Sequence, residues 1–135
     1  MPPEFTRFTF KKDERLSSRK IISKLFEEGK SFTISPFRML WLETTLSSSS
    51  PAQIAFAVPA KKIRLAVDRN RIKRQMREVY RKNKSSLCAL LKSQEKQCAM
   101  MIVFTGNPKP PFEEIEKKLK LTFLRFEEDF KKHAQ

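Results

Sequence analysis

Residues 54–104 read IAFAVPAKKIRLAVDRNRIKRQMREVYRKNKSSLCALLKSQEKQCAMMIVF, and this stretch decides the fold class. Apolar runs at residues 54–58 and 98–104 are short, and proline or polar residues flank them, so both predict strands. Helix-forming residues dominate between them from about Leu65 to Lys84, with an irregular continuation towards Leu91. A strand, a helix and a second strand in this order predict a crossover unit that packs on a β-sheet.

A second helix is predicted upstream of this unit. Asp13 or Ser17 can cap it, it runs to about Glu28, and Gly29 provides a stop. Residues 1–10 carry prolines and phenylalanines without a helical period, so we expect an extended lead-in there. The apolar residues of the predicted helix form one stripe: Ile21, Ile22, Leu25 and Phe26.

The remaining elements complete a single domain over residues 1–135. Residues 37–46, FRMLWLETTL, predict a strand that forms a hairpin with residues 54–58 through a polar loop at residues 47–50. Residues 112–130 repeat apolar side chains at helical spacing and predict a last amphipathic helix. This order of elements is typical of an α+β fold, with a single mixed β-sheet packed with helices.

Positive charge is the dominant compositional feature. The chain has 29 Lys and Arg against 15 Asp and Glu, a net charge of +14, which indicates a polyanionic partner such as nucleic acid. The charge is local, because residues 60–84 hold eleven cationic and two acidic residues, whereas residues 112–132 hold six of each. Twelve Phe and 39% hydrophobic residues exceed the apolar content of a disordered basic tail, so the charge is expected on a folded surface.

The central helix is predicted to carry one cationic face beside one core-facing stripe. At 100° per residue, Leu65, Ile72, Met76 and Val79 group on one side with Tyr80 next to them. Amphipathicity alone explains why the polar residues cluster, but not why almost none is acidic, and this bias favours an RNA or DNA contact. Arg71 lies apart from the face. The residues that share the cationic arc are Arg69, Asn70, Lys73, Arg74, Arg77, Arg81 and Lys84.

Residues 60–81, AKKIRLAVDRNRIKRQMREVYR, resemble the signature of the ribonuclease P protein family, an Arg-Asn-Arg helix preceded by a Lys-Lys turn. Residues 11–32, KKDERLSSRKIISKLFEEGKSF, resemble the N-terminal helix of that family, and the resemblance covers about residues 11–125. It implies an α+β domain with a left-handed β-α-β crossover. It also implies an RNA-binding subunit that assists a catalytic RNA in the endonucleolytic removal of the 5′ leader from precursor tRNA.

The resemblance assigns two groups of binding residues. Arg64 and Leu65 stand where the family usually has Gly-Asn, so the turn into the helix is expected to differ in shape. Ile22 stands where the family has an aromatic ring, which predicts weaker base stacking. The cleft for the single-stranded leader is expected to be lined by Ile22, Phe26 and Leu40. The contacts with the catalytic RNA are expected from Lys61, Lys62, Arg69, Asn70, Arg71, Lys73, Arg74, Arg77 and Arg81.

Two alternatives stay open on the sequence. Ile22 and Phe26 occupy adjacent turns of one helix face, a spacing that is also typical of core residues. The basic helix would equally suit a structural RNA- or DNA-binding protein of ribosomal or helix-turn-helix type, which would bind without assisting cleavage.

No catalytic residue is expected in the protein itself. Phosphodiester cleavage needs an activated water and charge neutralisation, but the chain has one histidine, His133, and its three aspartates, Asp13, Asp68 and Asp129, lie far apart. We therefore expect no metal site and no cofactor on the protein, with magnesium entering through the RNA. Cys88 and Cys98 do not have the spacing of metal ligands, so we expect both to be reduced thiols. No apolar stretch reaches the length of a membrane span, so a cytoplasmic location is expected.

Overall fold

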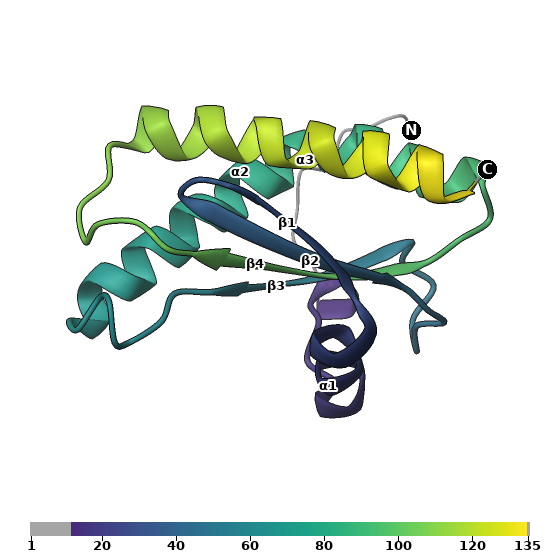
Figure 1. The fold of residues 1–135 in the computed structure, drawn as a ribbon, viewed down its shortest axis with the longest axis horizontal. Coiled ribbons are helices and arrows are strands. Elements are labelled where there is room, and N and C mark those ends of the chain that lie inside the picture. The colour runs from purple at the N-terminus through teal and green to yellow at the C-terminus, as the bar shows by residue number, and fades with distance from the viewer. Residues whose placement is uncertain (1–11, 135) are drawn as a thin grey trace.

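The computed structural model describes residues 12–134, so the expected lead-in at residues 1–10 lies outside the described residues (Figure 1). Three α-helices, a short 3-10 helix and a four-stranded mixed sheet confirm the predicted α+β class. The elements in chain order are η2 (Lys12–Glu14), α1 (Arg19–Glu28), β1 (Lys30–Ile34), β2 (Phe37–Glu43), β3 (Ala52–Ala57), α2 (Ala66–Ser93), β4 (Cys98–Phe104) and α3 (Phe112–Ala134).

The order of strands in the sheet is β1-β2-β4-β3, which corrects the predicted pairing. The hairpin lies between β1 and β2 and turns at residues 35–36, whereas β2 and β3 are not neighbours. β2 pairs antiparallel with β4, and β3 pairs parallel with β4. The loop after β2 therefore carries the chain across the sheet to its far edge. β1 was not predicted, because only Phe32 and Ile34 give KSFTI an apolar alternation.

The predicted crossover unit is present as β3, α2 and β4, with its two strands parallel and adjacent. The left-handed sense implied by the resemblance stays a prediction. α2 is longer than predicted and runs to Ser93, because the buried residues Leu87 and Leu91 continue its apolar stripe. Leu65 stands at the N-cap without a side-chain hydrogen bond to the helix.

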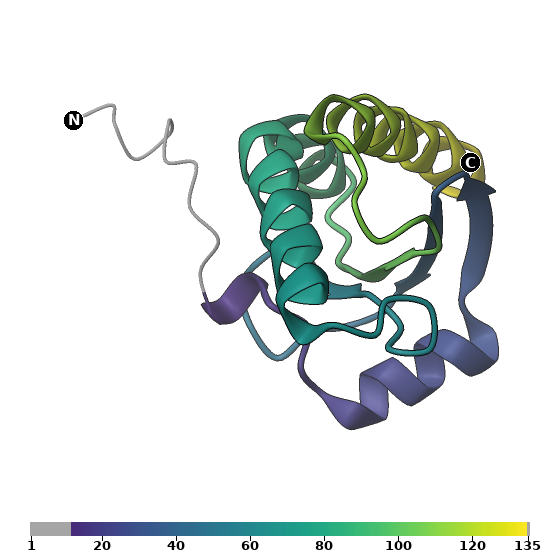
Figure 2. The same cartoon turned by 90° about the vertical axis from the view of Figure 1, so that its left-hand side faces the viewer.

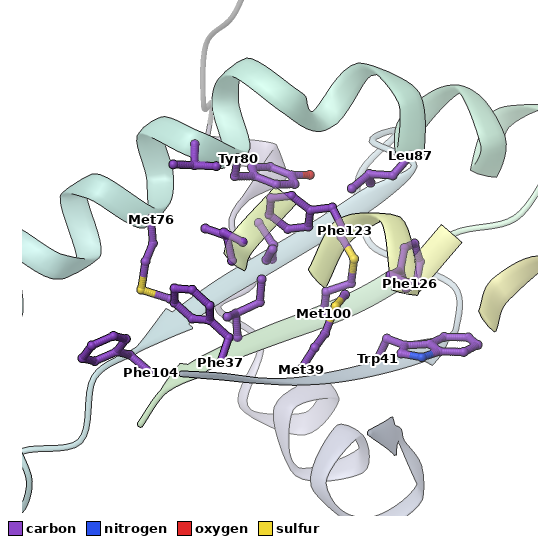
Figure 3. Packing of buried hydrophobic residues seen from close by; sticks show 14 of the residues in the cluster. Phe37, Met39, Trp41, Met76, Tyr80, Leu87, Met100, Phe104, Phe123 and Phe126 are labelled. Atoms are coloured by element: carbon purple, nitrogen blue, oxygen red, sulfur yellow. The ribbon is translucent and has the colours of Figure 1, made fainter. Parts of the chain in front are cut away.

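Helices cover the two faces of the sheet unequally. Figures 1 and 2 show α2 and α3 together on one face and α1 alone on the other. The larger hydrophobic cluster fills the α2 and α3 side, where Trp41 meets Phe126 edge-on with ring centroids 5.4 Å apart (Figure 3). The smaller cluster lies beneath α1 and includes Leu25, Leu40 and Met101. One short helix cannot cover a whole sheet face, so part of that face stays open.

The ends of α1 differ in part from the prediction. Ser18 caps the helix, since its Oγ accepts a hydrogen bond from the N–H of Ile21 at 3.3 Å, in place of Asp13 or Ser17. Gly29 ends the helix as predicted, and its N–H donates to the carbonyl of Leu25 at 2.9 Å. A Cβ at position 29 would lie 2.3 Å from that oxygen, so this close approach requires glycine.

Candidate RNA interface

The first three turns of α2 present most of the predicted cationic residues to solvent. Ile72, Met76 and Val79 of the same helix are fully buried, as predicted for the core stripe. Leu65 was predicted in that stripe and is 62% exposed, because it stands at the N-cap, before the first turn that packs on the core. Asn70, Arg74 and Arg77 are exposed and Lys73 is half-exposed. Within residues 12–134 none of these four side chains has a hydrogen-bond or ion-pair partner, so their donors are available. We call Asn70, Lys73, Arg74 and Arg77, together with Lys61 and Arg64 in the preceding turn, the basic face.

Arg69 is bound to the turn that leads into α2. Its Nη1 donates to the carbonyls of Ile63 and Arg64, at 2.8 Å each. The turn has Arg64 and Leu65 where the family that it resembles usually has Gly-Asn, and the guanidinium of Arg69 stabilises the path of this turn. A guanidinium has five N–H donors, so two bonds from Nη1 leave the Nε and Nη2 donors for a ligand.

Arg71 and Lys62 connect the start of α2 with the loop between β4 and α3. Nη2 of Arg71 donates to the carbonyl of Pro108 at 3.1 Å and lies 3.5 Å from a carboxylate oxygen of Asp68. Nζ of Lys62 donates to the carbonyl of Thr105 at 3.0 Å. Arg71 therefore lies apart from the basic face, as its angle on the helix predicted, and it holds a neighbouring loop.

The second half of the cationic arc is paired with acidic residues. Arg81 lies 2.6 Å from Glu78, and its hydrogen bond to that carboxylate lowers the pKa of Glu78. Lys84 contacts Glu14 of η2 at 2.6 Å, with both side chains largely buried. Unpaired positive charge on α2 is therefore concentrated near its start rather than spread along its length.

The structure places the three predicted cleft residues at different depths around α1. Phe26 is 55% exposed, so the alternative that it belongs to the core is wrong. Ile22 is half-buried against the smaller cluster. Leu40 is only 3% exposed and packs in the same cluster as Leu25, so its side chain offers little surface to a ligand. Phe26 is the ring of this group that a ligand could reach.

Arg38 is not among the residues predicted to line the cleft, although the alternation of β2 gives it the same face as Leu40. Its side chain is exposed on the part of the sheet that α1 leaves open. It is a cation two residues from a predicted cleft position, and this spacing could have identified it from the sequence.

Acidic residues, histidines and cysteines are the side chains that most often hold metal ions or transfer protons. Within residues 12–134, no three of them come together in a group that could hold a metal ion. His133 lies 3.3 Å from Glu43 and edge-on to Trp41. Burial raises the pKa of the Cys98 thiol to about 12, which makes it unreactive. In the same residues, no helix combines the length and the apolar character that a membrane span requires.

Comparisons with known protein sequences match most of this chain to one family. The family model for Ribonuclease P matches residues 10–127. A ribonuclease P protein component of Porphyromonas gingivalis is 30% identical over 118 residues, covering 87% of this chain and 86% of the relative. One of Chlorobium phaeobacteroides is 40% identical over 85 residues, covering 61% and 58%.

Solved structures give the same result for the fold. The ribonuclease P protein of Thermotoga maritima superposes with a TM-score of 0.61 at 25% identity, covering 82% of this chain and 94% of that one. The ribonuclease P protein of Staphylococcus aureus gives a TM-score of 0.61 at 18% identity, with coverages of 82% and 92%. The chain therefore belongs to the ribonuclease P protein family, as a protein subunit of the tRNA-processing ribonucleoprotein and a partner of its RNA.

Proposed function

We propose that this subunit positions precursor tRNA on the catalytic RNA, binding the RNA through the basic face and the 5′ leader beside α1. The observation that carries this proposal is that the cations of the basic face have no acidic partner within the described residues, in a chain of the ribonuclease P family. Arg pairs with phosphates through its planar fork of donors, and Asn can donate to and accept from base or sugar edges.

The leader is assigned to the α1 side because its sequence varies between precursors and its bases are single-stranded. An aromatic side chain can stack on any base, since every base has a π-face. Phe26 is an exposed ring on a helix that shares a sheet face with half-buried apolar residues. Ile22 stands beside Phe26 in place of a second ring, so Phe26 stacks weakly on the bases and accepts leaders of different sequence.

Catalysis is assigned to the RNA, with magnesium bound there and no cofactor on the protein. The protein contributes positioning and neutralisation of phosphate charge, both of which lower the barrier without a reacting side chain. This division of work suits a chain whose charged groups are mainly cations on a folded surface. The cytoplasmic location stays a prediction.

Reconstitution tests the proposal against a structural RNA-binding protein of ribosomal type. The protein is added to the cognate catalytic RNA, and leader cleavage is followed across a magnesium series. We expect the protein to lower the magnesium concentration needed for cleavage, and the repurified protein alone to cleave nothing. Tight binding to the RNA without a change in the magnesium requirement would favour the structural alternative. Cleavage by RNA-free protein would refute the assignment of catalysis to the RNA.

A further inference from the structure

The sheet face beneath α1 consists of cross-strand rows, which the strand register defines. One row contains Ser31, Leu40, Met101 and Ala55. The next row contains Thr33, Arg38, Val103 and Ala57, and we call it the open row. Leu40 and Met101 are buried in the cluster that contains Leu25 of α1, whereas Arg38 and Thr33 are exposed. The side of the sheet beneath α1 thus buries Leu40 and Met101 of the first row and leaves Arg38 and Thr33 of the second accessible.

Arg38 is the one charged member of the open row. Ala57 and Val103 are short side chains, and both are half-buried at the edge of the cluster beneath α1. Within the described residues 12–134, the guanidinium of Arg38 has no hydrogen-bond or ion-pair partner. An unpaired Arg beside small apolar residues suits a ligand that combines phosphates with planar bases, because guanidinium groups both pair with phosphate and stack on rings.

The position of the open row connects the two binding regions. It lies at the end of the sheet where β3 leads into the turn before α2, on the left in Figure 1. Thr105, just after β4, donates its N–H to the carbonyl of Pro36 at 2.8 Å and accepts from Nζ of Lys62 at 3.0 Å. Pro36 immediately precedes β2, so Thr105 links the start of the strand that carries Arg38 to the turn that contains Lys61 and Lys62.

We infer that Arg38 binds a phosphate of the single-stranded 5′ leader on the open row, between α1 and the turn before α2. The inference rests on the proposed function and adds to it a residue that the cleft of Ile22, Phe26 and Leu40 did not include. A guanidinium can stack on a base, so Arg38 compensates in part for the aromatic ring that Ile22 replaces. The leader then passes over an open apolar floor with one fixed positive charge, and the chain reads no base edge there.

The test uses the reconstituted ribonucleoprotein with Arg38→Ala, Arg38→Lys and the charge-matched control Lys120→Ala, which removes an exposed cation from α3. Affinities for precursor tRNA, for the same precursor with a shortened leader, and for mature tRNA are measured across a salt series. Arg38→Ala should weaken precursor binding by about two- to fivefold and lower the salt slope by roughly 0.7, the value for one single-strand phosphate. Arg38→Lys should keep the slope, because it keeps the charge.

Mature tRNA and the short-leader precursor should bind all variants equally, and melting temperatures should match because Arg38 is exposed. If Arg38→Ala behaves like Lys120→Ala while Phe26→Ala still loses leader-dependent affinity, the inference on Arg38 is wrong and the proposed function stands. If the wild-type enzyme binds precursor and mature tRNA equally, leader binding itself is refuted. An equal loss for both tRNAs also overturns the inference, since Arg38 would then act elsewhere.

Discussion

Replacing Phe26 by Ala tests whether this ring binds the leader or stabilises the fold. Because Phe26 is 55% exposed, its removal loses less than half of the transfer free energy of a fully buried Phe, about 1 kcal/mol. That loss lowers the melting temperature by roughly 3–5 °C in a domain of this size. A stack on a base contributes about 1 to 3 kcal/mol, or about 5- to 150-fold in affinity. Because Ile22 provides no second ring, we expect a stacking free energy of about 1 kcal/mol. Precursor tRNA should therefore bind to the Phe26→Ala enzyme about fivefold more weakly.

The assay compares equilibrium binding of precursor and mature tRNA to the reconstituted enzyme, with a thermal melt of each protein variant. Leu124→Ala is the matched control, since Leu124 is apolar, 57% exposed and on α3. Leu25→Ala reports a true core loss, because Leu25 is fully buried on α1 and its removal costs about 2 to 5 kcal/mol of stability. A Phe26→Ala variant that melts like Leu25→Ala and loses both tRNAs equally would refute the leader site.

Three further outcomes follow from the described contacts. Arg74→Ala with Arg77→Ala should reduce the salt slope of binding to the catalytic RNA by roughly 1.4 to 1.8, and filter binding should show no such change for Lys117→Ala with Lys120→Ala. Arg69→Ala should lower the free energy of unfolding in urea by about 1 kcal/mol, because it releases two carbonyls of the turn. Arg74 makes no such bonds, so an equal loss of unfolding free energy in Arg74→Ala would contradict this role of Arg69. In a Cys88→Ser background, Cys98 should resist alkylation at pH 8 until the chain unfolds, because its pKa is raised to about 12, and rapid labelling of the native protein would contradict its burial.

Periodicity within one segment predicted most helices and strands, because that information is local. The stripe of α2 and the stop at Gly29 follow from side-chain spacing alone. The pairing of β2 with β3 was wrong because short connections usually join neighbours, whereas here β4, distant in sequence, lies between them. No local pattern distinguishes these two arrangements.

The candidate site was predicted as a set of residue types but not as a set of contacts. The sequence shows that the start of α2 is basic, yet it does not show that Arg69 is bound to the turn or that Arg81 is paired with Glu78. Leu40 was predicted from alignment to line a cleft, and its depth beneath α1 depends on tertiary packing. The alternation of β2 could have placed Arg38 on the same face as Leu40, but its position opposite Val103 depends on a register with β4 that only the folded sheet defines.

β4 lies between β2 and β3 in the sheet, so the domain cannot fold during its synthesis before β4 has been made. Met100 and Ile102 belong to the hydrophobic cluster under α2 and α3, while Ala99 and Met101 belong to the cluster under α1. Neither cluster is complete until β4 has left the ribosome, because β2 and β3 have no contact with each other in the sheet without it. Long-range pairing of this kind slows folding. The cationic segment of α2 is therefore synthesised, and exposed to the RNA around it, before the sheet that orients it has formed.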